Sequence, residues 1–272
     1  MRHPWWCLLL SACTLTRHWD DLGPKSTDAG EPVPESFGGA VRFSSACAGA
    51  SDALSNVLEF GAGQSFTIEL WYQADRFDQF NLPVHDGGSS LNYAGWDIEI
   101  DSTGGLGFYA SDGAMIQSVA AVPQIIVLNH AYHMVATRDG ARAELWLLDA
   151  TNGEKLHRSM SIVDNFPTSW DNSLPFTVGG SATAVGNCVD YTNADGIIDE
   201  VRVWNTVRSG IELDRDYDQP IACDTPGLVA YYRLDEGNGA VLGDCSASQI
   251  HLDIVGGSAP TEYEWVTSPF DL

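Results

Sequence analysis

The stretch His133–Leu148 reads HMVATRDGARAELWLL and consists of two alternating apolar–polar runs joined by Asp139-Gly140. Alternation with a period of two is typical of a half-buried β-strand. Asp-Gly between two such runs predicts a tight hairpin, because both residues tolerate the positive φ angles that a two-residue turn requires. This stretch therefore predicts two neighbouring antiparallel strands.

The same alternation continues on both sides of this hairpin, from Phe37 onward. Clear examples are Phe66–Tyr72 and Trp96–Asp101, and the latter passes through a turn into Leu106–Tyr109. Further strands are expected at 174–178, 197–204 and 228–234.

A single short helix is expected after Arg208. Ser209 and Glu212 have the spacing of a capping box, in which the hydroxyl and the carboxylate satisfy free amides of the first helical turn. Many short strands, one helical turn and no βαβ alternation predict an all-β fold. The expected architecture is an antiparallel two-sheet β-sandwich with one short helix.

Charge excludes one class of partner. The 272 residues carry 37 acidic against 13 basic side chains, a net charge of -24. A field of this sign repels phosphate backbones, so nucleic acid is not an expected partner. It is compatible with cations, calcium included, or simply with solubility.

The amino terminus, MRHPWWCLLLSAC, has a basic start, a short apolar run and small residues, which is typical of an export signal. Leu10–Cys13 resembles a bacterial lipobox, which implies a lipoprotein signal peptide over 1–12 and a lipid anchor on Cys13. The expected location is the cell envelope (outer membrane or surface), with plain secretion as the alternative. Residues 13–36, rich in Gly, Pro and Ser, predict a flexible tether, and 37–272 form one domain.

Four cysteines remain if Cys7 and Cys13 are removed from the count. An even number in an oxidising compartment predicts two disulfides, and three connectivities are open. The favoured pairing is Cys223–Cys245, which closes a local loop and leaves Cys47–Cys188 as the second bond.

Three stretches together resemble the laminin G-like jelly-roll family of concanavalin A-like lectins and glucanases. They are Gly63–Trp71 (GQSFTIELW), His133–Gly140 (HMVATRDG) and Gly196–Asn205 (GIIDEVRVWN), the last followed by Arg208-Ser209. The resemblance covers roughly residues 40–257 and implies a single jelly-roll sandwich. It does not imply one function, since the family includes sugar-binding, protein-binding and structural domains.

Asp199 is a candidate calcium ligand. Alternation places it on the face of Ile197, Val201 and Val203, where an unpaired buried charge is costly. Members of the resembled family often bind calcium, which takes six to eight oxygen ligands, between a sheet edge and a loop. The further ligands would come from Asp52, Asn56, Asp190, Asn193 and Asp195. The alternative is a structural Asp199 held by backbone amides or an arginine.

Catalysis is not expected. Asp97-Ile98-Glu99-Ile100-Asp101 places alternate carboxylates on one face, as glycosidases of this fold do. The order departs from the glycosidase pattern, which has glutamate first and again after the aspartate. An ordinary strand, with the isoleucines inward and the carboxylates in water, fits better, and a glycoside hydrolase is kept as the alternative.

A bound sugar or peptide would require a partly exposed aromatic side chain with polar neighbours. Trp170 is the first candidate, followed by Tyr191 and Trp96. The sequence thus predicts a non-catalytic binding module of an exported lipoprotein that recognises a carbohydrate or a cell-surface or extracellular protein. Calcium is the one cofactor considered, the membrane is contacted only through the lipid anchor, and a purely structural envelope domain is a further alternative.

Overall fold

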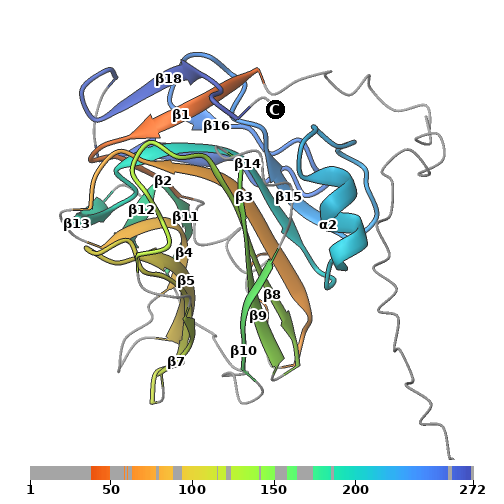
Figure 1. Cartoon of the computed structure of the whole chain (residues 1–272). Coiled ribbons are helices and arrows are strands. Elements are labelled where there is room, and N and C mark those ends of the chain that lie inside the picture. The colour runs from red at the N-terminus through yellow and green to blue at the C-terminus, as the bar shows by residue number, and fades with distance from the viewer. Residues whose placement is uncertain are drawn as a thin grey trace, which may run out of the picture. The chain divides into compact units, whose positions relative to one another are not determined.

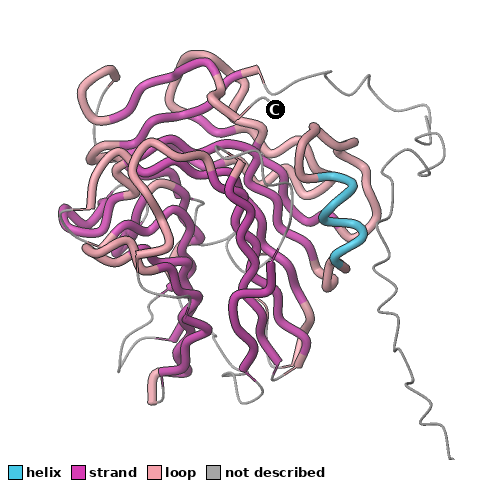
Figure 2. The backbone as a smooth tube through the Cα atoms, viewed as in Figure 1, coloured by secondary structure: helices cyan, strands magenta, loops and turns pink. Residues whose placement is uncertain are grey.

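The computed structural model describes residues 38–49, 58, 60, 63–77, 80–87, 94–114, 116–120, 124–140, 142–150, 158–163, 174–184, 187–256 and 259–270. The predicted signal peptide (1–12) and tether (13–36) lie outside these residues. Strands make up most of the described chain (Figure 2), and α2 (Gly210–Asp216) is the one helix in that part. No helix of the described part is long and apolar enough to cross a membrane.

Two β-sheets pack face to face (Figure 1). Sheet A has the order β10 (Arg158–Val163), β9 (Arg142–Asp149), β8 (Tyr132–Asp139), β3 (Phe66–Ala74), β14 (Gly196–Trp204), β1 (Gly39–Phe43) and β18 (Tyr263–Thr267), and β15 (Leu228–Tyr232) also pairs with β14. Sheet B has the order β16 (Val241–Leu242), β17 (Leu252–Val255), β2 (Cys47–Gly49), β11 (Phe176–Val178), β4 (Asn81–Gly87), β5 (Ala94–Ile100), β6 (Leu106–Asp112) and β7 (Ile116–Ala120). β12 (Gly180–Ala184) and β13 (Asn187–Asn193) form a separate hairpin. The strand pairs described are antiparallel, which confirms the predicted two-sheet sandwich.

The core lies between the sheets and takes apolar side chains from both. Phe66 of β3 meets Trp96 of β5 and Phe108 of β6, with ring centroids 5.9 and 6.2 Å apart. Trp96 also contacts Phe176 of β11, at 6.0 Å. Burial of such aromatic side chains supplies a large share of the apolar area that stabilises a sandwich of this kind.

The hairpin expected at Asp139-Gly140 is confirmed, although Asp139 is the last paired residue of β8 and not a turn residue. β8 and β9 pair directly, with Asp139 opposite Arg142, and Gly140 in the turn has a φ angle of 60°. The capping box at the start of α2 is also confirmed. The Ser209 amide donates to Glu212 Oε2 at 2.8 Å, and the Glu212 amide donates to Ser209 Oγ at 3.4 Å.

β14 contains a bulge that changes which side chains share a face. Its pairing with β3 shifts between Asp199 and Arg202. Asp199 is therefore paired with Trp71 on the outer face of sheet A, whereas Val201 and Val203 belong to the core. The prediction that Asp199 shares a face with these valines is wrong, because a bulge inserts an extra residue and breaks the period of two.

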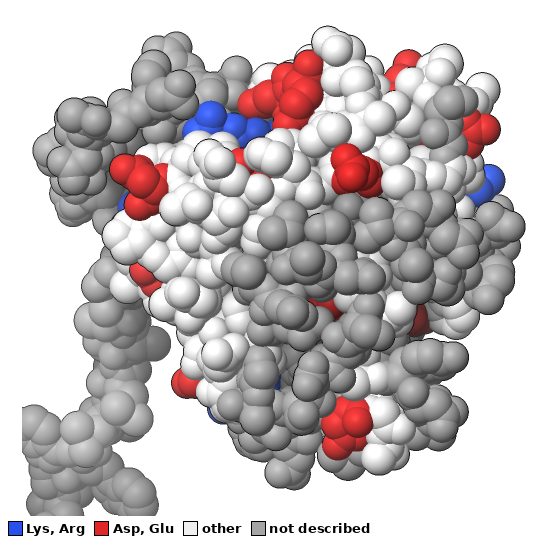
Figure 3. Space-filling model, turned by 180° about the vertical axis from the view of Figure 1, so that it is seen from behind, with Lys and Arg blue, Asp and Glu red and all other residues white. Residues whose placement is uncertain are grey.

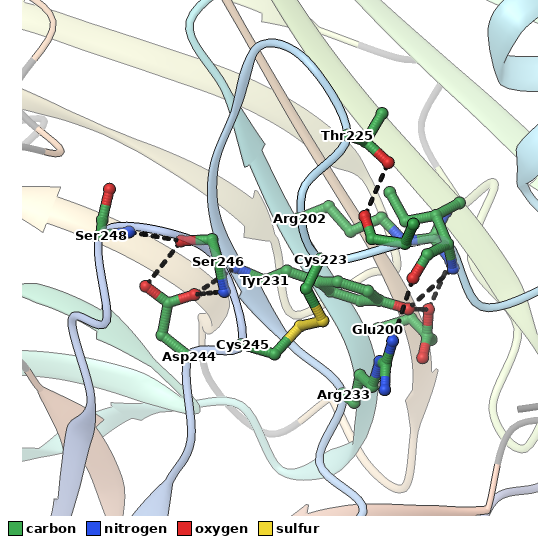
Figure 4. Close-up of a disulfide and its surroundings, with 12 residues drawn as sticks. Glu200, Arg202, Cys223, Thr225, Tyr231, Arg233, Asp244, Cys245, Ser246 and Ser248 are labelled. Carbon is green, nitrogen blue, oxygen red and sulfur yellow. Dashed lines mark hydrogen bonds and ion pairs between the residues drawn. A yellow bond between two sulfur atoms is a disulfide. The ribbon is translucent and has the colours of Figure 1, made fainter. Parts of the chain in front are cut away.

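The favoured disulfide, Cys223–Cys245, is present, with the two Cα atoms 5.4 Å apart. Both cysteines pack against a cluster that contains Trp204 and Tyr231, and Figure 4 shows Tyr231 beside the bond. Cys47 is also disulfide-bonded, but the side chain of Cys188 lies outside the described residues, so that pairing stays a prediction.

Replacing both Cys223 and Cys245 by alanine is expected to lower the free energy of unfolding by about 3 kcal/mol. The bond spans 22 residues, and cross-linking a loop of that length removes entropy from the unfolded chain. Urea denaturation of the variant and the unmodified protein, both without reductant, measures the loss. A difference below about 1 kcal/mol would contradict this estimate.

Candidate functional site on the outward face of sheet B

The outer face of sheet A is covered by other segments of the chain, namely α2 and the C-terminal segment. Trp71 stacks on Phe270 of the C-terminal segment, with ring centroids 5.5 Å apart. Its indole Nε1 donates to the carbonyl oxygen of Tyr217, at the end of α2, at 2.9 Å. Ile197 and Leu148 complete this buried cluster. A ligand therefore has no access to this part of sheet A.

The family motif in β14 supplies charged groups to the same covered face. Arg202 bonds the carboxylate of Glu200, which also accepts a hydrogen bond from the Tyr231 hydroxyl (Figure 4). Arg202 further donates to the carbonyl oxygens of Asp216 at 2.9 Å and Gln219 at 2.7 Å. Arg202 thus fastens α2 and the loop after it to the sheet.

Glu69 is the second buried acid of this face. Its Oε1 accepts from Trp204 Nε1 at 2.6 Å, and its Oε2 lies 3.4 Å from His133 Nε2. Burial alone would raise the pKa of Glu69, but the bond with His133 and the positive charges of Arg202 and Arg208 outweigh it and lower the pKa to about 2. The charged residues of the β14 motif, and Glu69 beside them, are therefore explained by contacts that hold the fold together.

The outward face of sheet B presents a row of polar side chains across five strands. Thr177, His85, Asp97, Tyr109 and Ser118 are paired in sequence from β11 to β7. Their strand neighbours Val178, Val84, Ile98, Phe108 and Val119 are buried in the core, so alternation directs the row away from the core. At the β4 side this face is bordered by the β12–β13 hairpin, and Thr177 Oγ1 donates to the Gly180 carbonyl at 2.6 Å.

Tyr109 forms an aromatic platform on this face. A Cβ atom added to Gly107 would lie 2.3 Å from Tyr109 Cε2 and 2.9 Å from its Cζ. The ring therefore leans along β6 and covers Gly107, a position that only glycine leaves free. Tyr109 is partly exposed, and Glu99 is the partner of Gly107 across β5 and β6.

Three carboxylates flank this ring. Burial and the charges of Glu99, Asp97 and Asp101 raise the pKa of the Tyr109 hydroxyl. Burial, with the neighbouring charge of Asp101, raises the pKa of Glu99 to about 7. Asp101 is held by the amides of Thr103 at 2.7 Å and Gly105 at 2.9 Å.

His85, the member of this row on β4, is buried. It is 3% exposed, and its Nδ1 has no hydrogen-bond partner in the described part of the chain. Burial lowers the pKa of His85 to about 4, so the imidazole is neutral at pH 7.

The structure corrects two expectations on this strand pair. Trp96 is 0% exposed in the core, so its prediction as a surface platform is wrong; alternation places it with Ile98 and Ile100. The isoleucines do point inward and the carboxylates outward, as expected. However, Asp97 is only 1% exposed, so the expectation that it lies in water is wrong.

The proposed calcium ligands are not brought together in the described residues. Asp199 accepts from the Glu200 amide at 2.8 Å and from Ser268 Oγ at 2.6 Å. Asp195 pairs with Arg76 at 2.7 Å, and Asn193 is buried at the end of β13. Asp52, Asn56 and Trp170 lie outside the described residues, as do the side chains of Asp190 and Tyr191. Among the described residues no group of three or more His, Cys, Asp or Glu could hold a metal ion, and calcium stays a prediction.

Sequence reasoning missed Tyr109 and His85. The signal for Tyr109 is present in Leu106–Tyr109 (LGFY), where alternation places Gly107 and Tyr109 together, opposite Leu106 and Phe108. A glycine two residues before a partly exposed tyrosine leaves room for the ring on the strand. His85 has no comparable local signal, because only the pairing of β4 with β5 brings it beside Asp97.

Comparison with known proteins agrees with this fold. Residues 48–213 match the laminin G family described as the concanavalin A-like lectin/glucanases superfamily. No curated protein matches the sequence.

Several solved structures are similar to this chain. A proposed carbohydrate-binding protein from Bacteroides ovatus superposes with a TM-score of 0.60 at 20% identity, over 87% of this chain and 61% of that one. The present chain thus spans about three fifths of that protein's length. A pentraxin from Limulus polyphemus gives a TM-score of 0.39 at 12% identity, over 68% and 77% of the two chains. The carbohydrate-binding module of a Ruminococcus gnavus sialidase, bound to sialyllactose, gives 0.45 at 14% identity, over 64% and 95%. The chain belongs to the concanavalin A-like lectin/glucanases superfamily and has its laminin G-like sandwich fold.

Proposed function

We propose that this protein is a non-catalytic carbohydrate-binding module whose ligand lies on the outward face of sheet B. The observation that carries the proposal is the Tyr109 ring, which covers Gly107 and is flanked by Asp97, Glu99 and Asp101. A partly exposed ring accepts the apolar face of a sugar, and nearby carboxylates accept hydrogen bonds from its hydroxyls. The family and the Bacteroides ovatus relative are in keeping with this role.

Replacing Tyr109 by alanine is expected to weaken glycan binding about 30-fold. Truncating an aromatic side chain at the centre of a binding surface costs on the order of 2 kcal/mol, which corresponds to that factor. The ligand is first identified by screening the full chain on a glycan array, and affinities are then measured by isothermal titration calorimetry.

Tyr109→Phe is the matched control, because it keeps the ring and removes only the hydroxyl. It is expected to retain binding within a few-fold. Thermal unfolding of both variants verifies that the fold is unchanged. Unaltered binding by the alanine variant would place the ligand elsewhere, and binding of a protein but no glycan would favour the protein-partner alternative.

A glycoside hydrolase is the second candidate, and one observation favours it. The raised pKa of Glu99, about 7, would let this carboxyl donate a proton near neutral pH. Hydrolysis requires a second carboxylate that reaches the sugar, and Asp97 on the same strand is 1% exposed. Release of reducing ends from any bound glycan, lost in Glu99→Gln, would establish hydrolysis; we expect none.

We further propose that the protein is exported and anchored through a lipid on Cys13, with the tether 13–36 holding the module away from the membrane. Metabolic labelling with a radioactive or alkyne-tagged fatty acid tests this. Label should be incorporated into the full chain and be absent from Cys13→Ser.

A further inference from the structure

Acidic side chains are the only charged groups on the described strands of sheet B. Asp97 and Glu99 alternate on the outward face of β5, and Asp101 follows at the strand's end. Lysine and arginine are absent from all eight of its strands.

Most of the described arginines belong to sheet A or to the segment around α2, and Arg76 and Arg233 lie in loops after β3 and β15. Strands of sheet A carry Arg42, Arg138, Arg142, Arg158 and Arg202, and the segment of α2 carries Arg208 and Arg215. Arg202 and Arg208 are engaged in contacts of the covered face, such as Arg202 with Glu200, whereas buried Arg138 bonds the carbonyl oxygens of Gly140 and Phe60. On the surface seen in Figure 3, acidic side chains form several separate patches, and the largest basic patch lies beside one of them near the top.

His85 is an independent indication that this face receives a ligand. It is nine-tenths buried or more, its Nδ1 lacks a partner in the described part of the chain, and it is paired with Asp97 in the row that contains Tyr109. A buried polar atom without a partner costs free energy, so a ligand hydroxyl or a water held by the ligand would satisfy it. Because His85 is neutral at pH 7, it adds no positive charge to the face.

We propose that the outward face of sheet B selects neutral glycans, built of hexoses or N-acetylhexosamines, and rejects glycans that carry carboxylate or sulfate groups. This inference rests on the proposed function and names its ligand class. Hydroxyls can donate to Glu99 and Asp101, whereas an acidic substituent would face like charges with no lysine or arginine on the strands of sheet B to compensate it. Arginine and lysine are the side chains that offer a positive charge to an acidic group, and these strands lack both.

Matched pairs of glycans test the proposal. The full chain is titrated at pH 7.5 with N-acetyllactosamine and its 3′-sialylated and 6-sulfated forms, and with neutral and uronic-acid-containing oligosaccharides of equal length. Each neutral member is expected to bind at least about tenfold more tightly than its acidic counterpart, because juxtaposed like charges are strongly disfavoured. The preference should shrink in 1 M NaCl, which screens the repulsion.

Glu99→Gln should raise the ratio of acidic to neutral affinity several-fold, whatever it does to the neutral affinity itself. Asp218→Asn is the matched control, because it removes one exposed carboxylate beyond α2, on the sheet A side, and should leave the ratio unchanged. Equal or preferential binding of acidic members, abolished in Tyr109→Ala, would overturn the selectivity and keep the proposed function. Absence of binding to every glycan, or binding indifferent to Tyr109→Ala, would overturn both.

Discussion

Replacing Arg202 by methionine is expected to lower the free energy of unfolding by about 3–5 kcal/mol. Arg202 is 1% exposed and bonds the carboxylate of Glu200 and the carbonyl oxygens of Asp216 and Gln219. Its charge also lowers the pKa of buried Glu69. Removing one member of a buried ion pair leaves the other charge uncompensated in a medium that solvates it poorly, which accounts for the size of the loss.

Arg215→Met is the matched control for Arg202→Met. Arg215 also contacts Asp216, through bonds of 2.7 Å, but its side chain is 53% exposed, so its loss should cost less than about 1 kcal/mol. Urea denaturation followed by tryptophan fluorescence measures both variants. Adding Glu200→Gln to Arg202→Met should recover part of the lost free energy of unfolding, since it removes the carboxylate charge that Arg202→Met leaves without a partner. Equal losses for the two arginine variants would contradict the role assigned to Arg202.

Local sequence patterns were sufficient for much of the fold. The hairpin at Asp139-Gly140, the capping box at Ser209 and Glu212, and the inward direction of Ile98 and Ile100 all depend on residues within a few positions of one another. Backbone sterics, hydrogen bonding and alternation act over the same short range, so such features can be derived without knowing the tertiary structure.

Other features depend on a bulge, on the register between strands and on what covers a sheet, none of which can be derived from alternation along one strand. The bulge at Asp199–Arg202 reverses the expected faces of β14, and nothing in the local pattern marks it. His85 and Asp97 meet only through the register of β4 against β5, and their burial depends on what covers the sheet. Trp96 has the polar neighbours of a surface sugar platform, yet it packs against Phe66 and Phe176 in the core.

The stability of the protein between pH 4 and pH 7 is expected to contain two opposing contributions from sheet B. His85 has a folded-state pKa of about 4 against an ordinary value of 6.5. The unfolded chain therefore takes up the proton first, and His85 favours the folded state above pH 6.5 and loses about 3 kcal/mol of that contribution as the pH falls to 4. Glu99 has a folded-state pKa of about 7 against 4.5, so its contribution is present below pH 4.5 and is lost as the pH rises through 7. The contribution of Glu99 to the free energy of unfolding is smaller than its pKa shift alone would give, because the side chain is partly exposed to solvent.

Two variants separate these contributions because each removes one titrating group from the same face. In His85→Gln the rise in unfolding free energy from pH 4 to pH 6.5 should be about 3 kcal/mol smaller than in the unmodified protein. In Glu99→Gln the same rise should be larger, and the variant should be more stable than the unmodified protein at pH 8. Urea unfolding at half-unit pH intervals measures both curves, and shifts of the same sign in the two variants would contradict the opposed environments of His85 and Glu99. The neutral imidazole of His85 and the carboxylate of Glu99 are the groups proposed to bind the sugar. Glycan affinity should therefore change at the same pH values at which the free energy of unfolding changes slope. Tyr109→Phe should leave both of these pH values unchanged.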